Sequence, residues 1–229
     1  MNRQRGKLIV IDGLDGSGKA TQAALLLEHL QKTGREAEKI SFPDYQNPSS
    51  TLVRMYLAGE IGTVDQVNAY AASSFYSVDR YVSFQNIWKT AYEKGHTILA
   101  DRYTTSNAAH QMGKEPRENW DAFLDWLADF EYNKLGLPKP DLVIYLDMHP
   151  NTSRALLSQR YAGDESKRDI HEANLSYLLH CREAALYAAE RWDWQVVRCC
   201  DGSQPHPIEK IAREVWQIAD SLWEDGLPR

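Results

Sequence analysis

The sequence predicts an α/β fold with a five-stranded parallel sheet and helices on both of its faces. Along the 229 residues, five short predicted strands, the first of them apolar and β-branched, alternate with longer segments of helical periodicity. Such alternation is typical of right-handed βαβ crossovers, which build parallel sheets. Three of the strands also end in charged or turn-forming residues. Because ligands of these sheets bind at the carboxyl ends of the strands, we expect the functional site at that edge.

The first half of the chain supplies three of these strands. The run at 8–11 is uniformly apolar, as expected for a strand buried on both faces, and a helical pattern follows as far as a capping Gly34. A second strand over 38–42 ends at Pro43, and helical patterns then reach residue 57 and span 64–93. The third strand, 97–100, runs directly into a charged pair at 101–102.

The second half repeats the alternation with two further strands. Helical stretches are predicted near 106–112 and over 117–132, before a stiff proline-containing linker at 137–140. Strands at 141–146 and 195–199 enclose helices at 152–161 and 173–191, and an amphipathic helix spans 207–223. The chain shows no internal repeat and no second domain, so we expect residues 1–229 to form one domain.

Composition excludes several classes of function. The net charge of −6 indicates no global attraction to nucleic acid or to an anionic membrane, and no apolar run has the length of a membrane span. The N-terminus lacks the apolar segment of a signal peptide. Three cysteines form no CxxC pair and seven histidines show no metal-ligand spacing. Buried, reduced thiols in a cytoplasmic protein are therefore expected.

The strongest motif is the stretch 13–19, which fits the phosphate-binding pattern G-x-x-x-x-G-K between the first strand and the first helix. Gly13, Gly16 and Gly18 allow the backbone to turn its N–H groups inward at a helix N-terminus, where anions bind. Lys19 adds a charge over the transferring phosphates. The alternative is a tight strand-to-helix turn, which requires the glycines and leaves the lysine unexplained.

One position departs from the motif. The residue after Lys19, which is normally a serine or threonine bound to Mg²⁺, is Ala20, and the hydroxyl comes one residue later on Thr21. Within the loop, the carboxylate of Asp15 would repel phosphate, so it must face a metal, a sugar or an arginine.

Three further groups of residues suggest ligand chemistry. Asp101 at a strand end is placed to hold Mg²⁺ or its waters, and Arg102 beside it suits bidentate phosphate binding. The alternative is a simple salt bridge between the two.

Tyr76 and Arg80 share one helix face, so the tyrosine could stack on a planar base while the arginine hydrogen-bonds its edge. The alternative is a tyrosine in the core with an arginine on the surface. The third group comprises the cations Arg160, Lys167 and Arg168. They could form a lid that closes over bound phosphates, or they could be a solvated run of charges balanced by acidic neighbours.

Taken together, these stretches resemble the thymidylate kinase family of nucleoside monophosphate kinases over nearly the whole chain. The resemblance rests on six motifs, which are IDGLDGSGK, SFPDY, YSVDRY, DRYTTSNAAHQ, LPKPDLVIYLD and RDIHE. It implies a three-layer P-loop NTPase fold with a lid at about 160–170. It also implies ATP and dTMP as substrates, Mg²⁺ as cofactor and a homodimer formed through helices.

The resemblance also assigns roles to individual residues. ATP would be bound by Gly13, Leu14, Asp15, Gly16, Ser17, Gly18, Lys19, Ala20 and Thr21. The residues expected to bind dTMP are Asp15, Phe42, Pro43, Tyr45, Tyr76, Arg80, Arg102, Asn107, His110 and Gln111. Catalytic charge is expected from Lys19, Arg102, Arg160 and Arg168, and metal ligation from Asp15 and Asp101. The loop has no arginine, so the lid must supply the arginine that stabilises the transition state.

The implied reaction is in-line attack of a dTMP phosphate oxygen on the γ-phosphoryl group of ATP, without a general base. The chain departs from the family pattern at Asp12, where glutamate is expected, and at His110, where tyrosine or phenylalanine is usual. Two other functions stay open. A deoxynucleoside kinase would need a carboxylate base near the 5′ oxygen, and a catalytically impaired ATP-binding regulator would be consistent with Ala20.

Overall fold

The computed structural model describes residues 5–160 and 175–224. Its main sheet has the order β2-β3-β1-β4-β5, and every neighbouring pair is parallel. The strands are β1 (Leu8–Gly13), β2 (Ala37–Ser41), β3 (Thr97–Asp101), β4 (Leu142–Asp147) and β5 (Gln195–Arg198). The predicted five-stranded parallel sheet is thus confirmed. A short antiparallel hairpin of β6 (Cys200–Asp201) and β7 (Gln204–Pro205) follows it and was not predicted.

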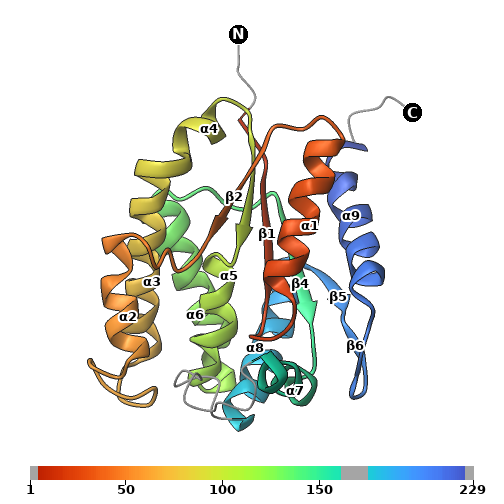
Figure 1. Ribbon diagram of the computed structural model, residues 1–229. Helices are drawn as coiled ribbons and strands as arrows, with labels where there is room; N and C mark the ends of the chain where they lie inside the picture. The colour runs from red at the N-terminus through yellow and green to blue at the C-terminus, as the bar shows by residue number, and fades with distance from the viewer. Residues whose placement is uncertain (1–4, 161–174, 225–229) are drawn as a thin grey trace.

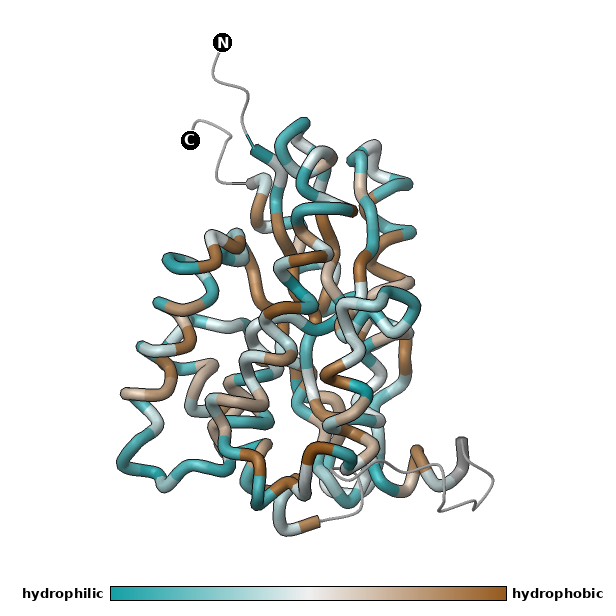
Figure 2. The backbone as a smooth tube through the Cα atoms, turned by 90° about the vertical axis from the view of Figure 1, so that its left-hand side faces the viewer, coloured by the Kyte–Doolittle hydropathy of each residue, from teal (hydrophilic) through white to brown (hydrophobic). Residues whose placement is uncertain are grey.

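Helices cover both faces of the sheet, as the α/β prediction requires (Figure 1). The central strand alternates between two cores, because Ile9 and Ile11 face one layer while Leu8 and Val10 face the other. The first layer consists of α1 (Lys19–Lys32) and α9 (Ile208–Glu224). The second layer includes α5 (Thr104–His110), α6 (Trp120–Ala128) and α8 (Leu175–Arg191). Along the helices, apolar and polar stretches alternate (Figure 2), as expected where one side packs on a neighbour.

The long predicted helix at 64–93 is wrong in its start and its continuity. The helix α3 spans Ala69–Ser83, because the side chain of Asn68 caps it by accepting a hydrogen bond from the Ala71 N–H at 2.8 Å. A wide π-helical turn, Phe84–Trp88, then separates it from α4 (Lys89–Glu93). The helix α2 (Thr51–Leu57) packs beside α3.

The prediction at 117–132 requires a similar correction. The regular helix α6 is preceded by a 3₁₀ turn at Arg117–Asn119 and followed by a π-helical segment, Asp129–Lys134. The helix α7 spans Pro150–Arg160, two residues earlier at its start than the pattern indicated. None of the helices in the two described ranges is long and apolar enough to cross a membrane.

Candidate functional site

A cavity of about 500 Å³ opens at the carboxyl ends of β1, β2 and β3. It lies at the sheet edge where the sequence predicts ligand binding. Its walls come from the phosphate loop, the loop after β2, and the helices α3, α5 and α7. Among the candidate residues it brings together Asp15, Gly16, Gly18, Lys19, Ala20, Thr21, Phe42, Pro43, Tyr45, Tyr76, Arg80, Asp101, Arg102, Asn107, His110 and Gln111. Gly13, Leu14 and Ser17 belong to the same loop but do not line the cavity.

The phosphate loop depends on glycine at two kinds of position. Gly16 and Gly18 have φ values of 80° and 91°, a left-handed conformation that disfavours side chains. At Gly16 a Cβ atom would also lie 2.6 Å from the carbonyl oxygen of Ser153, whereas at Gly18 it would meet nothing. The loop closes through a hydrogen bond from the Ser17 N–H to the Leu14 carbonyl oxygen at 3.1 Å. It delivers the chain into α1, whose first N–H groups are left without helical partners.

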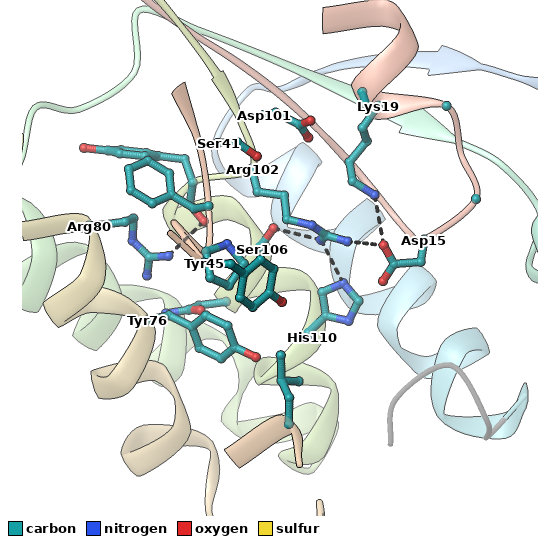
Figure 3. Close-up of a pocket in the computed structure, with 18 of the residues that line it drawn as sticks. Asp15, Lys19, Ser41, Tyr45, Tyr76, Arg80, Asp101, Arg102, Ser106 and His110 are labelled. Carbon is teal, nitrogen blue, oxygen red and sulfur yellow. Dashed lines mark hydrogen bonds and ion pairs between the residues drawn. The ribbon is translucent and has the colours of Figure 1, made fainter. Parts of the chain in front are cut away.

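Two cations in the cavity converge on Asp15, as Figure 3 shows. The Arg102 Nη2 atom lies 2.5 Å from Asp15 Oδ1, and Lys19 Nζ lies 3.5 Å from the same oxygen. Lys19 also donates to the carbonyl oxygen of Leu14 at 2.9 Å. Burial alone would raise the pKa of Asp15, but Arg102, Lys19 and His110 together hold that pKa well below its ordinary value. The carboxylate therefore faces an arginine, one of the three partners that the sequence requires.

Arg102 occupies the centre of the cavity through an unusual backbone conformation. Its φ is 69°, and its N–H donates to the carbonyl oxygen of Ile11 at 3.0 Å. The guanidinium donates from Nη1 to Ser106 Oγ at 3.2 Å and approaches His110 Nε2 at 3.4 Å. Burial opposes its charge, but Asp15 and Asp12 raise the pKa of Arg102. It therefore stays a cation throughout the accessible pH range, as phosphate binding requires.

Asp101 presents a different carboxylate. Its side chain is nearly buried, and its closest cation is Lys39, whose Nζ is 4.0 Å away. Burial is the main cause that raises the pKa of Asp101. A carboxylate that lines a phosphate site with so distant a partner is suited to a divalent cation.

At the edge of the phosphate loop, Ala20 contributes only a methyl group, and Thr21 lines both this cavity and a groove beside α9.

The far end of the cavity is aromatic. Phe42, Pro43, Tyr45 and Tyr76 line it, and Tyr45 is 53% exposed at the entrance. The edge of the Tyr56 ring lies against Tyr76, with centroids 6.4 Å apart and planes at 88°. A flat ring of nucleobase size would find stacking partners here.

Arg80 is not the surface arginine of the alternative hypothesis. Only 1% of it is exposed, and it still lines the cavity. Beside it, Gln111 is also buried, and its Oε1 atom has no hydrogen-bond partner within the described part of the chain. The amide nitrogen of Asn107 donates to the carbonyl oxygen of Ser73 at 3.2 Å, which joins α5 to α3. Donors and an acceptor thus surround the aromatic end.

Three buried carboxylates support the site, and our sequence analysis gave none of them a supporting role. Asp12 accepts hydrogen bonds from Thr105 and Ser106 at 2.5 and 2.7 Å. Asp79 accepts from the Asp44 N–H at 2.9 Å and so holds the loop after β2. Glu131 is fully buried and pairs with Arg80. For Glu131 a signal was present, because it falls four residues after Leu127 on the buried face of its helix, where a carboxylate needs a partner.

The proposed lid lies almost entirely outside the described residues. Arg160 ends α7, and its side chain is outside the description, as are Lys167 and Arg168. The lid and its alternative, a solvated charge run, therefore stay predictions from the sequence.

Comparison with known proteins identifies the family. The sequence model named thymidylate kinase matches residues 11–213. A thymidylate kinase of Danio rerio is 32% identical over 225 residues, covering 97% of this chain and 93% of that protein. One of Caenorhabditis elegans is 33% identical over 232 residues, covering 96% and 93%.

A solved structure agrees with these sequence matches. A thymidylate kinase structure from Candida albicans covers 98% of this chain and 96% of its own, with a TM-score of 0.68 and 24% identity, which supports the fold. The family match, the full-length relatives and the shared fold lead to one conclusion. This chain belongs to the thymidylate kinase family.

Proposed function

We propose that this kinase transfers the γ-phosphoryl group of ATP to the phosphate of dTMP, giving ADP and dTDP. The observation that carries the proposal is the order of groups along one cavity (Figure 3). The phosphate loop with Lys19 stands at one end, Arg102 at the centre, and the aromatic end with Tyr76 and Arg80 opposite. A nucleotide base at the aromatic end places its own phosphate at Arg102, next to the phosphates of ATP.

The chemistry needs alignment and charge rather than a base. The attacking phosphate oxygen of dTMP is already anionic, so no group has to remove a proton. Lys19 binds the ATP phosphates, and Arg102 binds the acceptor phosphate. Both neutralise the negative charge that spreads over the transferring group. The loop N–H groups at the start of α1 hold the phosphates against the sheet edge.

The aromatic end is suited to a keto-pyrimidine. Stacking on Tyr76 orients the ring, Arg80 donates to a ring carbonyl, and Gln111 Oε1 accepts from a ring N–H. Phe42, Pro43 and Tyr45 limit the space to a single ring. Asn107 and His110 lie along the sugar.

Mg²⁺ fits the residues present, and Asp101 would be its protein ligand. The carboxylate of Asp101 is nearly buried beside the phosphate loop, and its ion-pair partner Lys39 is 4.0 Å away, whereas Asp15 is directly engaged by Arg102 and Lys19. Bound with ATP, the ion would neutralise phosphate charge and orient the phosphates. Since Ala20 has no hydroxyl, waters and the ATP oxygens would have to supply the remaining ligands.

The lid arginines are the candidates for further transition-state charge. The phosphate loop contains no arginine, so Arg160 or Arg168 would have to supply it. Replacing the responsible residue by alanine lowers kcat about 10²-fold with little change in the KM for dTMP. Wild-type turnover in both Arg160→Ala and Arg168→Ala would assign these cations to a solvated run.

The chain would act as a single-domain homodimer in the cytoplasm. Supporting the dimer, α3 and the turn after it expose apolar side chains, among them Val78 at 43%, Tyr81 at 39% and Ile87 at 52%. A Val78→Glu variant run beside the wild type on size exclusion with light scattering tests this assembly. A monomeric wild type would contradict it.

Release of ADP tests the proposed function against its alternatives. The purified protein is mixed with ATP, Mg²⁺ and one acceptor at a time, namely dTMP, dUMP, dCMP, AMP, GMP or thymidine. The proposal expects the highest kcat/KM with dTMP, less with dUMP and little with purines. Turnover of thymidine without turnover of dTMP would indicate a deoxynucleoside kinase, and no acceptor-dependent ADP release would indicate a regulator.

A further inference from the structure

Glu131 is the most completely bonded carboxylate of the described residues near the site. It has no exposed surface, and it lies in the π-helical segment after α6, far from the phosphate loop in sequence. Its Oε2 atom accepts from Arg80 Nε at 2.8 Å and from Thr104 Oγ1 at 2.5 Å. Its Oε1 atom accepts from Arg80 Nη2, from Ser77 Oγ at 2.7 Å and more weakly from Asn107 Nδ2 at 3.4 Å. One carboxylate thereby joins α3, α5 and the segment after α6.

The pairing determines how Arg80 can meet a ligand. A guanidinium has five N–H donors in a rigid plane. Glu131 takes one donor on Nε and one on Nη2, and the carbonyl oxygen of Tyr103 accepts from Nη1 at 3.3 Å. Within the described residues, two N–H groups remain without a partner, one on each terminal nitrogen, and Arg80 lines the cavity at its aromatic end (Figure 3). The plane and the direction of these two donors are set by the carboxylate behind them.

The same carboxylate keeps the arginine charged despite its burial. Burial alone would lower the pKa of Arg80, but the charge and hydrogen bonds of Glu131 raise it above the ordinary value. Arg80 can therefore only donate to a base and never accept from one. A base with a carbonyl at this edge can accept a hydrogen bond from Arg80. A base with an amino group there would place its own N–H donors against those of the arginine, which is unfavourable.

We infer that Glu131 is a positioning residue for base selection, orienting Arg80 so that the site accepts keto-pyrimidine monophosphates and rejects amino-pyrimidine ones. This inference rests on the proposed function and extends it to a residue that touches no substrate. The relevant pair of acceptors is dTMP and dCMP, which carry a carbonyl and an amino group, respectively, at the same ring position. A purely structural role for Glu131 would affect both acceptors equally, so the two roles make different predictions.

The experiment compares Glu131→Gln with the wild type. The substitution keeps size but replaces one acceptor oxygen by an amide nitrogen, which cannot accept from Arg80. The measured quantity is kcat/KM for dTMP divided by kcat/KM for dCMP. This ratio does not depend on the fraction of folded enzyme, so partial unfolding leaves it interpretable. We expect the ratio to fall at least about tenfold, through a higher KM for dTMP and a lower KM for dCMP.

Ser77→Ala is the matched control. It removes a hydrogen bond to the same carboxylate and leaves the Arg80 pair in place. We expect lower stability with an unchanged ratio. Glu131→Asp is the second test variant and retains the charge with a shorter reach, and its ratio falls in the same direction. Circular dichroism reports how much of each variant is folded.

The outcomes separate the two proposals. A wild type that prefers dTMP to dCMP, with the same preference in Glu131→Gln and Glu131→Asp, would overturn the role of Glu131 and leave the proposed function intact. A fall in the ratio in Ser77→Ala equal to that in Glu131→Gln would also overturn it, since any loss at the carboxylate would then suffice. No turnover of dTMP by folded wild type would refute the proposed function itself.

Discussion

The two ends of the cavity are built in different ways. The phosphate end is a single continuous stretch from β1 to α1, and it relies on backbone N–H groups, two left-handed glycines and one lysine. The aromatic end draws side chains from the loop after β2, from α3 and from α5, and depends on a buried ion pair 51 residues apart in sequence. The phosphate end is thus formed by one local stretch, mainly through its backbone. The aromatic end is formed by side chains that are far apart in the sequence.

This difference predicts how each end responds to substitution. At the phosphate end, a change matters when it removes the lysine or obstructs the backbone, and other side chains are interchangeable. At the aromatic end, a change to a supporting residue alters which acceptor is chosen before it alters the rate. Replacements at both ends therefore distinguish a loss of rate from a loss of selectivity.

The largest effect is expected for Lys19→Ala. The ammonium group is the only loop side chain that adds positive charge at the ATP phosphates, so kcat should fall about 10³-fold. Steady-state ADP release measures this, with unchanged circular dichroism as the check on folding. The control is Lys32→Ala on the exposed end of α1, where the lysine pairs with the exposed Glu28. A kcat for Lys19→Ala within tenfold of wild type would show that the loop backbone suffices.

A second test compares two glycines of the loop. Gly16→Ala combines a strained φ with a contact of 2.6 Å to the Ser153 carbonyl oxygen, so it should displace the loop and lower kcat about 10²-fold. Gly18→Ala has the same kind of φ but open space, so it should cost only about 1–2 kcal/mol of strain. Urea unfolding and kcat are measured for both. Equal losses in the two variants would rule out the contact as the cause.

Ala20→Thr should have a smaller effect. Water and the ATP oxygens can complete the coordination of Mg²⁺, so adding the usual hydroxyl should change kcat by less than about tenfold. The Mg²⁺ concentration at half-maximal rate and the affinity for Mg·ATP are measured together. An inactive wild type whose turnover appears only in Ala20→Thr or Ala20→Ser would instead identify an impaired enzyme.

The smallest effect concerns the support of the aromatic end. Lys114 donates to the Tyr56 hydroxyl at 2.7 Å, and burial lowers the pKa of Lys114 from 10.5 to about 8. Below pH 8 the lysine is protonated in both the folded and the unfolded protein, and burying its charge lowers the free energy of unfolding. Between pH 8 and 10.5 the unfolded chain binds more protons, so this residue makes stability rise with pH.

The measurement is the free energy of unfolding of wild type minus that of Lys114→Met, followed from pH 7 to 10. The difference should increase with pH, since the methionine variant lacks the titration. A difference that stays constant over this range would mean that Lys114 titrates near its ordinary pKa.

The fold and the phosphate end could be predicted from the sequence because both depend on local patterns. Apolar runs identify the central strands β1, β3 and β4, the alternation with helical segments identifies β2 and β5, and the spacing of Gly13, Gly18 and Lys19 identifies the loop. The extent of the helices was less accessible, because the cap at Asn68 and the π-helical turns follow from packing rather than periodicity. The environment of Arg80 could not be derived from its own helix, since its partner, Glu131, comes from another element.

The pairing of Arg102 with Asp15 has a kinetic consequence. In the proposed reaction, an incoming phosphate would not meet a bare cation but would exchange with the carboxylate of Asp15, which is already paired with Arg102, as one anion replaces another on an ion-exchange resin. The affinity for the acceptor is then the difference between two ion pairs, which keeps it moderate. When the diphosphate product leaves, the carboxylate is at hand to receive the arginine again. In this proposal, the carboxylate that competes with the substrate would thus also shorten the residence time of the product.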